Sequence, residues 1–146
     1  MTADTIEILL VEDDPADAEL TLHAFQSAKL ANRVHLVTDG QEALDFLFRE
    51  GAYGGRPDGK PRLVLLDLKL PKVDGLEVLR RIKADGGLRT VPVVVMTSSR
   101  QERDVVESYA LGVNSFIQKP VDFERFTEAV REIGYYWVLL NQPPAA

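Results

Sequence analysis

Five short apolar segments recur along this chain at intervals of roughly thirty residues, which leaves room for one helix between successive strands. They span residues 6–11, 34–38, 63–66, 91–96 and 116–118. Most are continuously apolar rather than alternating, which is typical of strands buried on both faces of a parallel sheet. The pattern therefore predicts a parallel sheet with connecting helices.

The segments between these strands carry apolar residues at helical spacing. The residues that share a helix face are Leu20, Ala24 and Ala28; Ala43, Leu44, Leu47 and Phe48; Leu76, Leu79 and Ile82; and Val105, Val106 and Tyr109. Helix start signals precede these faces: Asp14 before Pro15, and Asp39 with Glu42, Asp74 with Glu77 and Ser99 with Glu102 at capping-box spacing. This alternation predicts a doubly wound α/β fold with right-handed crossovers and helices on both faces of an open sheet.

Length and composition bound the possible functions. A chain of 146 residues, 45% hydrophobic and 27% charged, is expected to form one domain at residues 5–140, followed by a short tail at 141–146 and no output domain. No apolar run approaches the roughly 20 residues that cross a bilayer, so we expect no membrane segment and a cytoplasmic location. The lack of cysteine excludes disulfides and thiolate sites, and a net charge of −6 argues against nucleic acid as a partner.

Candidate site residues directly follow the first, third, fourth and fifth apolar segments. They are Glu12 and Asp13 after the first, Asp67 after the third, Thr97 and Ser98 after the fourth, and Lys119 after the fifth. Ligands of open α/β sheets bind beyond the carboxyl ends of the strands, so these side chains are expected to converge on one site.

The expected site has a chemistry of its own. Three carboxylates at one sheet edge repel one another unless a cation lies between them, and Mg²⁺ prefers oxygen ligands of this kind. A threonine hydroxyl and a lysine ammonium beside them can hold the oxygens of a phosphoryl group. The set therefore indicates phosphoryl transfer to a carboxylate, with Mg²⁺ as the cofactor.

Four motifs carry a family resemblance: VEDD at 11–14, LLDLKLPKVDG at 65–75, VVVMTS at 93–98 and FIQKP at 116–120. In this order and spacing they resemble the receiver domain of two-component response regulators, over about residues 5–133. The resemblance implies a flavodoxin-like five-stranded parallel sheet with strand order 2-1-3-4-5.

The resemblance also implies roles for the carboxylates. Asp67 matches the residue that accepts a phosphoryl group from a histidine kinase. Asp13 matches a direct Mg²⁺ ligand, Glu12 its acidic companion that holds a metal-bound water, and the backbone carbonyl of Lys69 a further ligand.

Four other positions match the family's switch. Thr97 and Lys119 correspond to the hydroxyl and the cation that contact the phosphoryl group, and Phe116 to an aromatic residue that turns inward when the threonine moves. Taken alone, Phe116 would be read as a core residue. The bond between Lys119 and Pro120 resembles a cis peptide of the family.

The chain also departs from the common pattern. Lys69 and Ser99 stand two residues after the acceptor and the threonine, at positions that influence access of water to the phosphorylated aspartate. An extra stretch at 50–61 lengthens the loop before the third strand. The stretch, the DLKLP motif and a long last helix resemble single-domain regulators that partner phytochrome-type histidine kinases, which implies such a kinase as a partner.

Two enzyme classes fit the sequence poorly. Gly54, Gly59 and Lys60 match the phosphate-binding loop of nucleotide hydrolases, but Pro61 stands where a hydroxyl must meet Mg²⁺, and the loop precedes a strand. A phosphatase with an aspartate nucleophile needs a second acid two residues later, where this chain has Lys69. We therefore expect no turnover enzyme, only self-catalysed phosphorylation and dephosphorylation. The alternative is a receiver-like interaction module that is independent of phosphorylation.

The last predicted helix begins near residue 122 and continues past the length that a receiver needs. Its apolar seam consists of Phe126, Val130, Ile133, Trp137 and Leu140. The overhang at 135–140 predicts a contact surface, and a second copy of the chain would make it a homodimer. Alternatively, this segment folds back over its own domain.

Overall fold

The computed structural model describes residues 8–28, 33–56, 60–97, 111–113, 115–119 and 124. The elements are β1 (Ile8–Val11), α1 (Pro15–Ala28), β2 (Val34–Val37), α2 (Gly40–Phe48), the 3₁₀ turn η1 (Gly51–Tyr53), β3 (Leu63–Asp67), α3 (Gly75–Ala84), β4 (Val93–Thr97) and β5 (Ser115–Gln118). The fourth and last predicted helices lie outside the described residues. Strands β3 and β4 each end one residue later than expected, so that Asp67 and Thr97 are their final residues.

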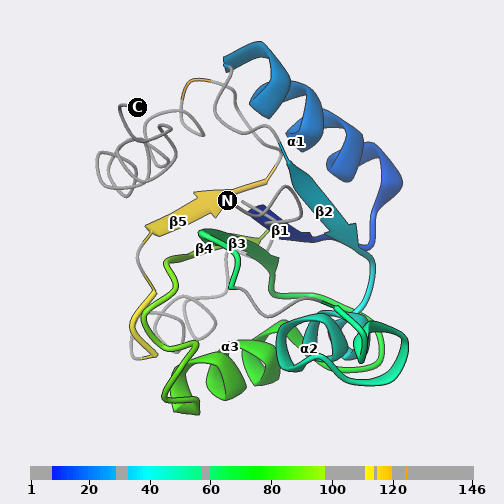
Figure 1. The fold of residues 1–146 in the computed structure, drawn as a ribbon. Helices are drawn as coiled ribbons and strands as arrows, with labels where there is room; N and C mark the ends of the chain where they lie inside the picture. The colour runs from blue at the N-terminus through cyan, green and yellow to red at the C-terminus, as the bar shows by residue number, and fades with distance from the viewer. Residues whose placement is uncertain are drawn as a thin grey trace, which may run out of the picture.

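The five strands form one parallel sheet in the order β2-β1-β3-β4-β5, which confirms the predicted fold. Helix α1 lies on one face of the sheet, and α2 and α3 lie side by side on the other (Figure 1). In the register, Val11 is opposite Leu66 and Asp67 is opposite Met96. The carboxyl ends of β1, β3, β4 and β5 therefore meet along one edge of the sheet.

Successive strand residues enter two separate core layers, which explains why the strands are continuously apolar. In β1, Leu9 and Val11 pack on the face that α2 and α3 cover, while Ile8 and Leu10 pack with Phe25 of α1. All four residues of β1 are fully buried. A polar residue in such a strand is tolerated only at its end.

Helix α1 buries a different face from the one that the apolar spacing suggested. Ala18, Thr21 and Phe25 are buried, whereas Leu20 is 45% exposed. Phe25 brings the largest apolar side chain of this helix to the sheet, and each residue along a helix turns by about 100°. That rotation places Leu20 about 100° or more around the helix axis from each of these buried residues, where it faces solvent.

Aspartates cap the helices as predicted. The Asp14 carboxylate accepts hydrogen bonds from the backbone N–H groups of Ala16 and Asp17, at 2.8 and 3.2 Å. Asp39 accepts from Glu42 N–H at 2.7 Å, and Asp74 accepts from Leu76 N–H at 2.9 Å. These bonds satisfy backbone donors that have no partner within the helix, so each helix starts at a fixed residue beside the sheet edge.

The extra stretch before β3 is fastened to α2 and β2. The Tyr53 hydroxyl donates to Glu42 at 2.8 Å and lies 3.1 Å from His35 Nε2. Arg56 lies over the ring of Phe46, 4.2 Å from its centroid, and its Nε donates to the backbone oxygen of the same residue. The described part of this loop therefore packs against the domain.

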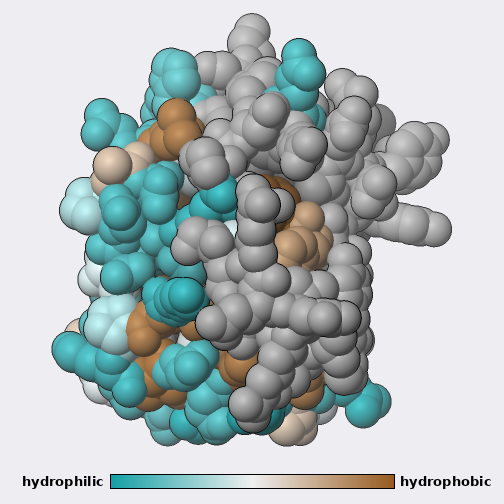
Figure 2. Space-filling view, turned by 180° about the vertical axis from the view of Figure 1, so that it is seen from behind, coloured by the Kyte–Doolittle hydropathy of each residue, from teal (hydrophilic) through white to brown (hydrophobic). Residues whose placement is uncertain are grey.

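The described surface is mostly hydrophilic on the side opposite to the view of Figure 1, with hydrophobic side chains in small separate areas (Figure 2). Within the described residues, no helix combines the length and the apolar character needed to span a membrane.

Gly75 allows the end of β3 to lie directly against the start of α3. A Cβ at this position would be 2.3 Å from the backbone oxygen of Asp67 and 2.6 Å from Leu68 Cα. The Gly75 N–H donates to the Leu68 carbonyl at 3.0 Å, which holds the two segments at this separation. The contact is with backbone atoms, so no side-chain rotation relieves it.

We predict that Gly75→Ala destabilises the fold by about 1–3 kcal/mol, because the new methyl group overpacks the end of β3. Urea unfolding followed by circular dichroism measures the change. Gly86→Ala is the matched control, since a Cβ at Gly86 meets nothing within 4 Å. Equal unfolding midpoints for the two variants would contradict the packing argument.

Candidate functional site

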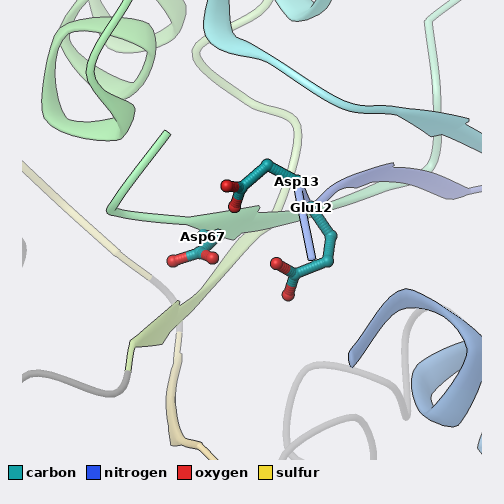
Figure 3. A group of neighbouring side chains, drawn as sticks. All are labelled: Glu12, Asp13 and Asp67. Carbon is teal, nitrogen blue, oxygen red and sulfur yellow. The ribbon is translucent and has the colours of Figure 1, made fainter. Parts of the chain in front are cut away.

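Three carboxylates from two neighbouring strands converge at the carboxyl edge of the sheet. Glu12 and Asp13 directly follow β1, and Asp67 ends β3 (Figure 3). Each offers an oxygen atom such that all three oxygens lie within 4.8 Å of one another. Glu12 and Asp67 are buried, whereas Asp13 is exposed. The structure thus brings together the carboxylates that the sequence predicted.

Lys119 brings a positive charge into this cluster from β5. Its backbone N–H donates to the Thr97 carbonyl at 2.9 Å, which fixes its main chain beside the end of β4. Its ammonium nitrogen Nζ lies 2.8 Å from Asp67 Oδ2, 2.5 Å from Glu12 Oε1 and 3.0 Å from Asp17 Oδ2. One buried cation is therefore shared by carboxylates from β3, the end of β1 and α1.

Burial and mutual repulsion perturb the charges of this group. Burial raises the pKa of Glu12 to about 7, and the neighbouring Asp67 adds to the rise while the Lys119 ammonium opposes it. Burial alone would lower the pKa of Lys119, but the carboxylates of Asp67, Glu12 and Asp17 outweigh it and hold that pKa above its usual value. Lys119 is therefore charged at neutral pH, whereas Glu12 gains a proton easily.

The Asp67 carboxylate is held from two sides. Oδ1 accepts a hydrogen bond from the Lys69 N–H at 3.1 Å, and Oδ2 accepts from Lys119 Nζ at 2.8 Å. The Leu68 N–H continues the sheet by donating to the Met96 carbonyl at 3.1 Å. A carboxylate with both oxygens fixed is oriented for attack on an electrophile that approaches the sheet edge.

The cluster fits a hard divalent cation. Glu12 Oε1 is buried and has no partner with hydrogen-bond geometry, although Lys119 Nζ lies close to it. One ammonium cannot balance the three carboxylates, so the cluster keeps an excess of negative charge. An oxygen-only donor set with spare negative charge is what Mg²⁺ and similar ions bind.

The remaining predicted site residues have mixed outcomes. Thr97 is fully buried at the end of β4. Phe116 is partly buried and packs against the core layer under α2 and α3. The lysine side chain of residue 69 is exposed. The rest of the predicted positions, Ser98, Ser99, Pro120, Phe126, Val130, Ile133, Trp137 and Leu140, lie outside the described residues.

Sequence reasoning missed Asp17. It lies in the first turn of α1 and contacts Lys119 across 102 positions of sequence. The available signal was its position in the first turn of α1, because that turn starts just after the carboxyl end of β1. An acidic residue in a first helical turn is also favoured by the helix dipole, and this ordinary explanation concealed the contact.

The comparison with protein families identifies one match. The response regulator receiver domain family matches residues 8–131 of this chain. That span includes all the carboxylates of the cluster, as well as Lys119.

Two curated relatives are similar over nearly the whole chain. The probable methanogenesis regulatory protein FilR2 of Methanothrix harundinacea is 46% identical, over 97% of this chain and 89% of its own length. The response regulator Rcp1 of Synechocystis is 40% identical, over 95% of this chain and 93% of its own length.

Three solved structures share the fold at substantial identity. The bacteriophytochrome response regulator RtBRR has a TM-score of 0.84 and 52% identity, and the match covers 97% of this chain and 85% of RtBRR. The Mn²⁺-bound form of Rcp1 has a TM-score of 0.77 and 39% identity, and the match covers 94% of this chain and 98% of Rcp1. The phosphorylated cyanobacterial phytochrome response regulator RcpA has a TM-score of 0.78 and 39% identity, covering 97% and 99%.

We predict that Lys119→Met lowers the free energy of unfolding by about 3–5 kcal/mol in metal-free buffer, because it leaves Glu12 and Asp67 buried without their cation. Urea unfolding in the presence of a chelator measures the loss. Excess Mg²⁺ should recover part of it, since a bound cation restores the missing positive charge.

Lys69→Met is the matched control, since the lysine side chain at 69 is exposed and only its backbone N–H contacts Asp67. It should change the free energy of unfolding by no more than about 0.5 kcal/mol. Equal losses in both variants would show that the Lys119 ammonium does not hold the cluster together.

Proposed function

Since the chain belongs to the response regulator receiver family, we propose that it accepts a phosphoryl group from a histidine kinase on Asp67 in a magnesium-dependent reaction. The observation that carries the proposal is the position of the Lys119 ammonium, 2.8 Å from Asp67 Oδ2 and inside a carboxylate cluster. Neither helix capping nor solubility explains why a buried lysine and two further acids surround one aspartate. They match the requirements of phosphoryl transfer to that aspartate.

The reaction is a displacement at phosphorus. A carboxylate oxygen of Asp67 attacks the phosphorus atom of a phosphohistidine, the new P–O bond forms, and the P–N bond to the imidazole breaks. The leaving imidazole nitrogen keeps the electron pair and takes up a proton. The Lys69 N–H keeps the Asp67 carboxylate oriented, and the Lys119 ammonium balances charge that collects on the phosphoryl oxygens.

The cation would be held by the carboxylates of Asp13, Glu12 and Asp67 and by the backbone carbonyl of Lys69. When bound, Mg²⁺ supplies the positive charge that lets a dianionic donor approach an acidic site. The Mn²⁺-bound form of the related Rcp1 supports a divalent ion in this chain, and the choice of Mg²⁺ rests on the all-oxygen donor set.

The switch that follows phosphorylation would act through Thr97 and Phe116. Thr97 ends the strand next to Asp67 and is fully buried, so a new contact to a phosphoryl oxygen would move a packed residue. Phe116 lies on the adjacent strand and is partly exposed, so an inward rotation would bury more of its ring. Phosphorylation would thereby alter the surface that carries β5 and its neighbours.

We propose that the chain acts in the cytoplasm and that its partner is a histidine kinase of the phytochrome type. Similarity to regulators that are named for bacteriophytochromes and cyanobacterial phytochromes supports this class of kinase. We propose that the chain works as a stand-alone switch, with no turnover of outside substrates. Its only chemistry would be its own phosphorylation and dephosphorylation.

We also propose a homodimer formed through the last helix. The support is the apolar seam of Phe126, Val130, Ile133, Trp137 and Leu140 in the sequence. Size-exclusion chromatography with light scattering, at tens of micromolar protein, should give twice the mass of the chain. A monomer with and without phosphorylation would contradict the dimer.

Incubation of the protein with Mg²⁺ and a small phosphodonor, followed by intact mass spectrometry, tests the proposed function. The expected result is the added mass of one phosphoryl group, lost when a chelator removes Mg²⁺ and absent in Asp67→Asn. Glu77→Gln is the matched control, because it removes one exposed carboxylate of α3 that is not part of the cluster. Wild type that stays unmodified would favour a phosphorylation-independent interaction module instead.

A further inference from the structure

We propose that Asp17 is a positioning residue for Lys119, which holds one N–H of the ammonium before phosphorylation and releases it to a phosphoryl oxygen afterwards. The inference rests on the proposed function and adds a residue to it. Its basis is the contact of 3.0 Å between Lys119 Nζ and Asp17 Oδ2.

The number of N–H donors on the Lys119 ammonium limits how many oxygen atoms it can hold. An ammonium has three N–H groups and no acceptor. Lys119 Nζ donates to Asp17 and Asp67 and lies 2.5 Å from the carboxylate of Glu12, so three carboxylates surround it. A phosphoryl oxygen that reaches this nitrogen must therefore replace one of them.

Asp17 is the most exposed of the three carboxylates around Lys119. The side chains of Glu12 and Asp67 are 0% and 6% exposed, whereas the side chain of Asp17 is 28% exposed. A buried carboxylate that loses its cation stays desolvated without a partner, which is costly in free energy. At a partly exposed carboxylate, water can replace the lost cation. Asp17 is thus the contact that costs least to break.

The main chain of Asp17 is held independently of its side chain. The Asp17 backbone N–H donates to the Asp14 carboxylate at 3.2 Å, and its carbonyl accepts from the Thr21 hydroxyl at 2.9 Å. These contacts belong to the main chain of α1 and persist when the Asp17 side chain rotates. Release therefore needs one side-chain rotation and no movement of the helix.

The charge of Asp17 is expected to slow phosphorylation, so that a variant without this charge should react faster. Its negative charge lies beside the atom that must receive a phosphoryl oxygen, so it competes with the incoming dianion for Lys119. Asp17→Asn keeps the shape of the side chain and removes the competing charge. The Lys119 donor is then more readily available when the phosphodonor arrives.

The test compares rates of phosphorylation by acetyl phosphate at saturating Mg²⁺, followed by intact mass. We expect Asp17→Asn to react about three- to tenfold faster than wild type, the size of effect of one nearby charge at a partly exposed site. Asp17→Glu restores the charge and should return the rate toward that of wild type. A merely structural role for Asp17 would slow the reaction in both variants.

Glu19→Gln is the charge-matched control, because Glu19 is an exposed residue of the same helix. Its rate should equal that of wild type. A rate for Asp17→Asn at or below wild type, or an equal acceleration in Glu19→Gln, would overturn the inference.

If Asp17→Asn does not fold, Asp17→Ser removes the same charge, and its phosphorylation rate is compared with that of wild type instead.

The proposed function and this inference can fail separately. If the wild-type protein takes up no phosphoryl group, both the proposed function and this inference are refuted. If the wild-type protein reacts and Asp17→Asn reacts at the same rate, only the inference is refuted.

Discussion

The site depends on one buried ammonium that is shared by carboxylates from different elements. The side chain of Lys119 is 7% exposed and contacts side chains from the end of β1, from α1 and from β3. Burying these charges is expensive, and only their mutual proximity offsets the cost. The buried carboxylates of Glu12 and Asp67 therefore rely on the lysine, and the lysine relies on the fold that brings them together.

The parallel sheet supplies that arrangement without any special loop. All five strands run in the same direction, so every strand ends at one edge, and the order β2-β1-β3-β4-β5 places β1 and β4 on either side of β3. Asp67 lies at the centre of this edge. Gly75 keeps α3 close behind it, and the Lys69 N–H orients one carboxylate oxygen. The contacts on both of its oxygens therefore hold the Asp67 carboxylate in one orientation.

The sequence was sufficient for the parts of this account that depend on local patterns. Continuous apolar runs predicted the strands, and aspartates at helix starts predicted the caps at Asp14, Asp39 and Asp74. Convergence of Glu12, Asp13, Asp67 and Lys119 followed from the rule that parallel strands end at one edge. Long-range geometry was not predictable in the same way. The exposure of Leu20 depends on the rotation of α1, and the Asp17 contact depends on how α1 lies across the sheet.

The central claim is that Asp67 is the acceptor, and chemical mapping tests it most directly. Borohydride reduces an aspartyl phosphate to homoserine, so the treated protein can be digested and sequenced by mass spectrometry. Homoserine is expected at position 67 after incubation with Mg²⁺ and phosphodonor, and nowhere in a sample without donor. Homoserine at another aspartate, or none at position 67 in protein that has gained a phosphoryl group, would contradict the claim.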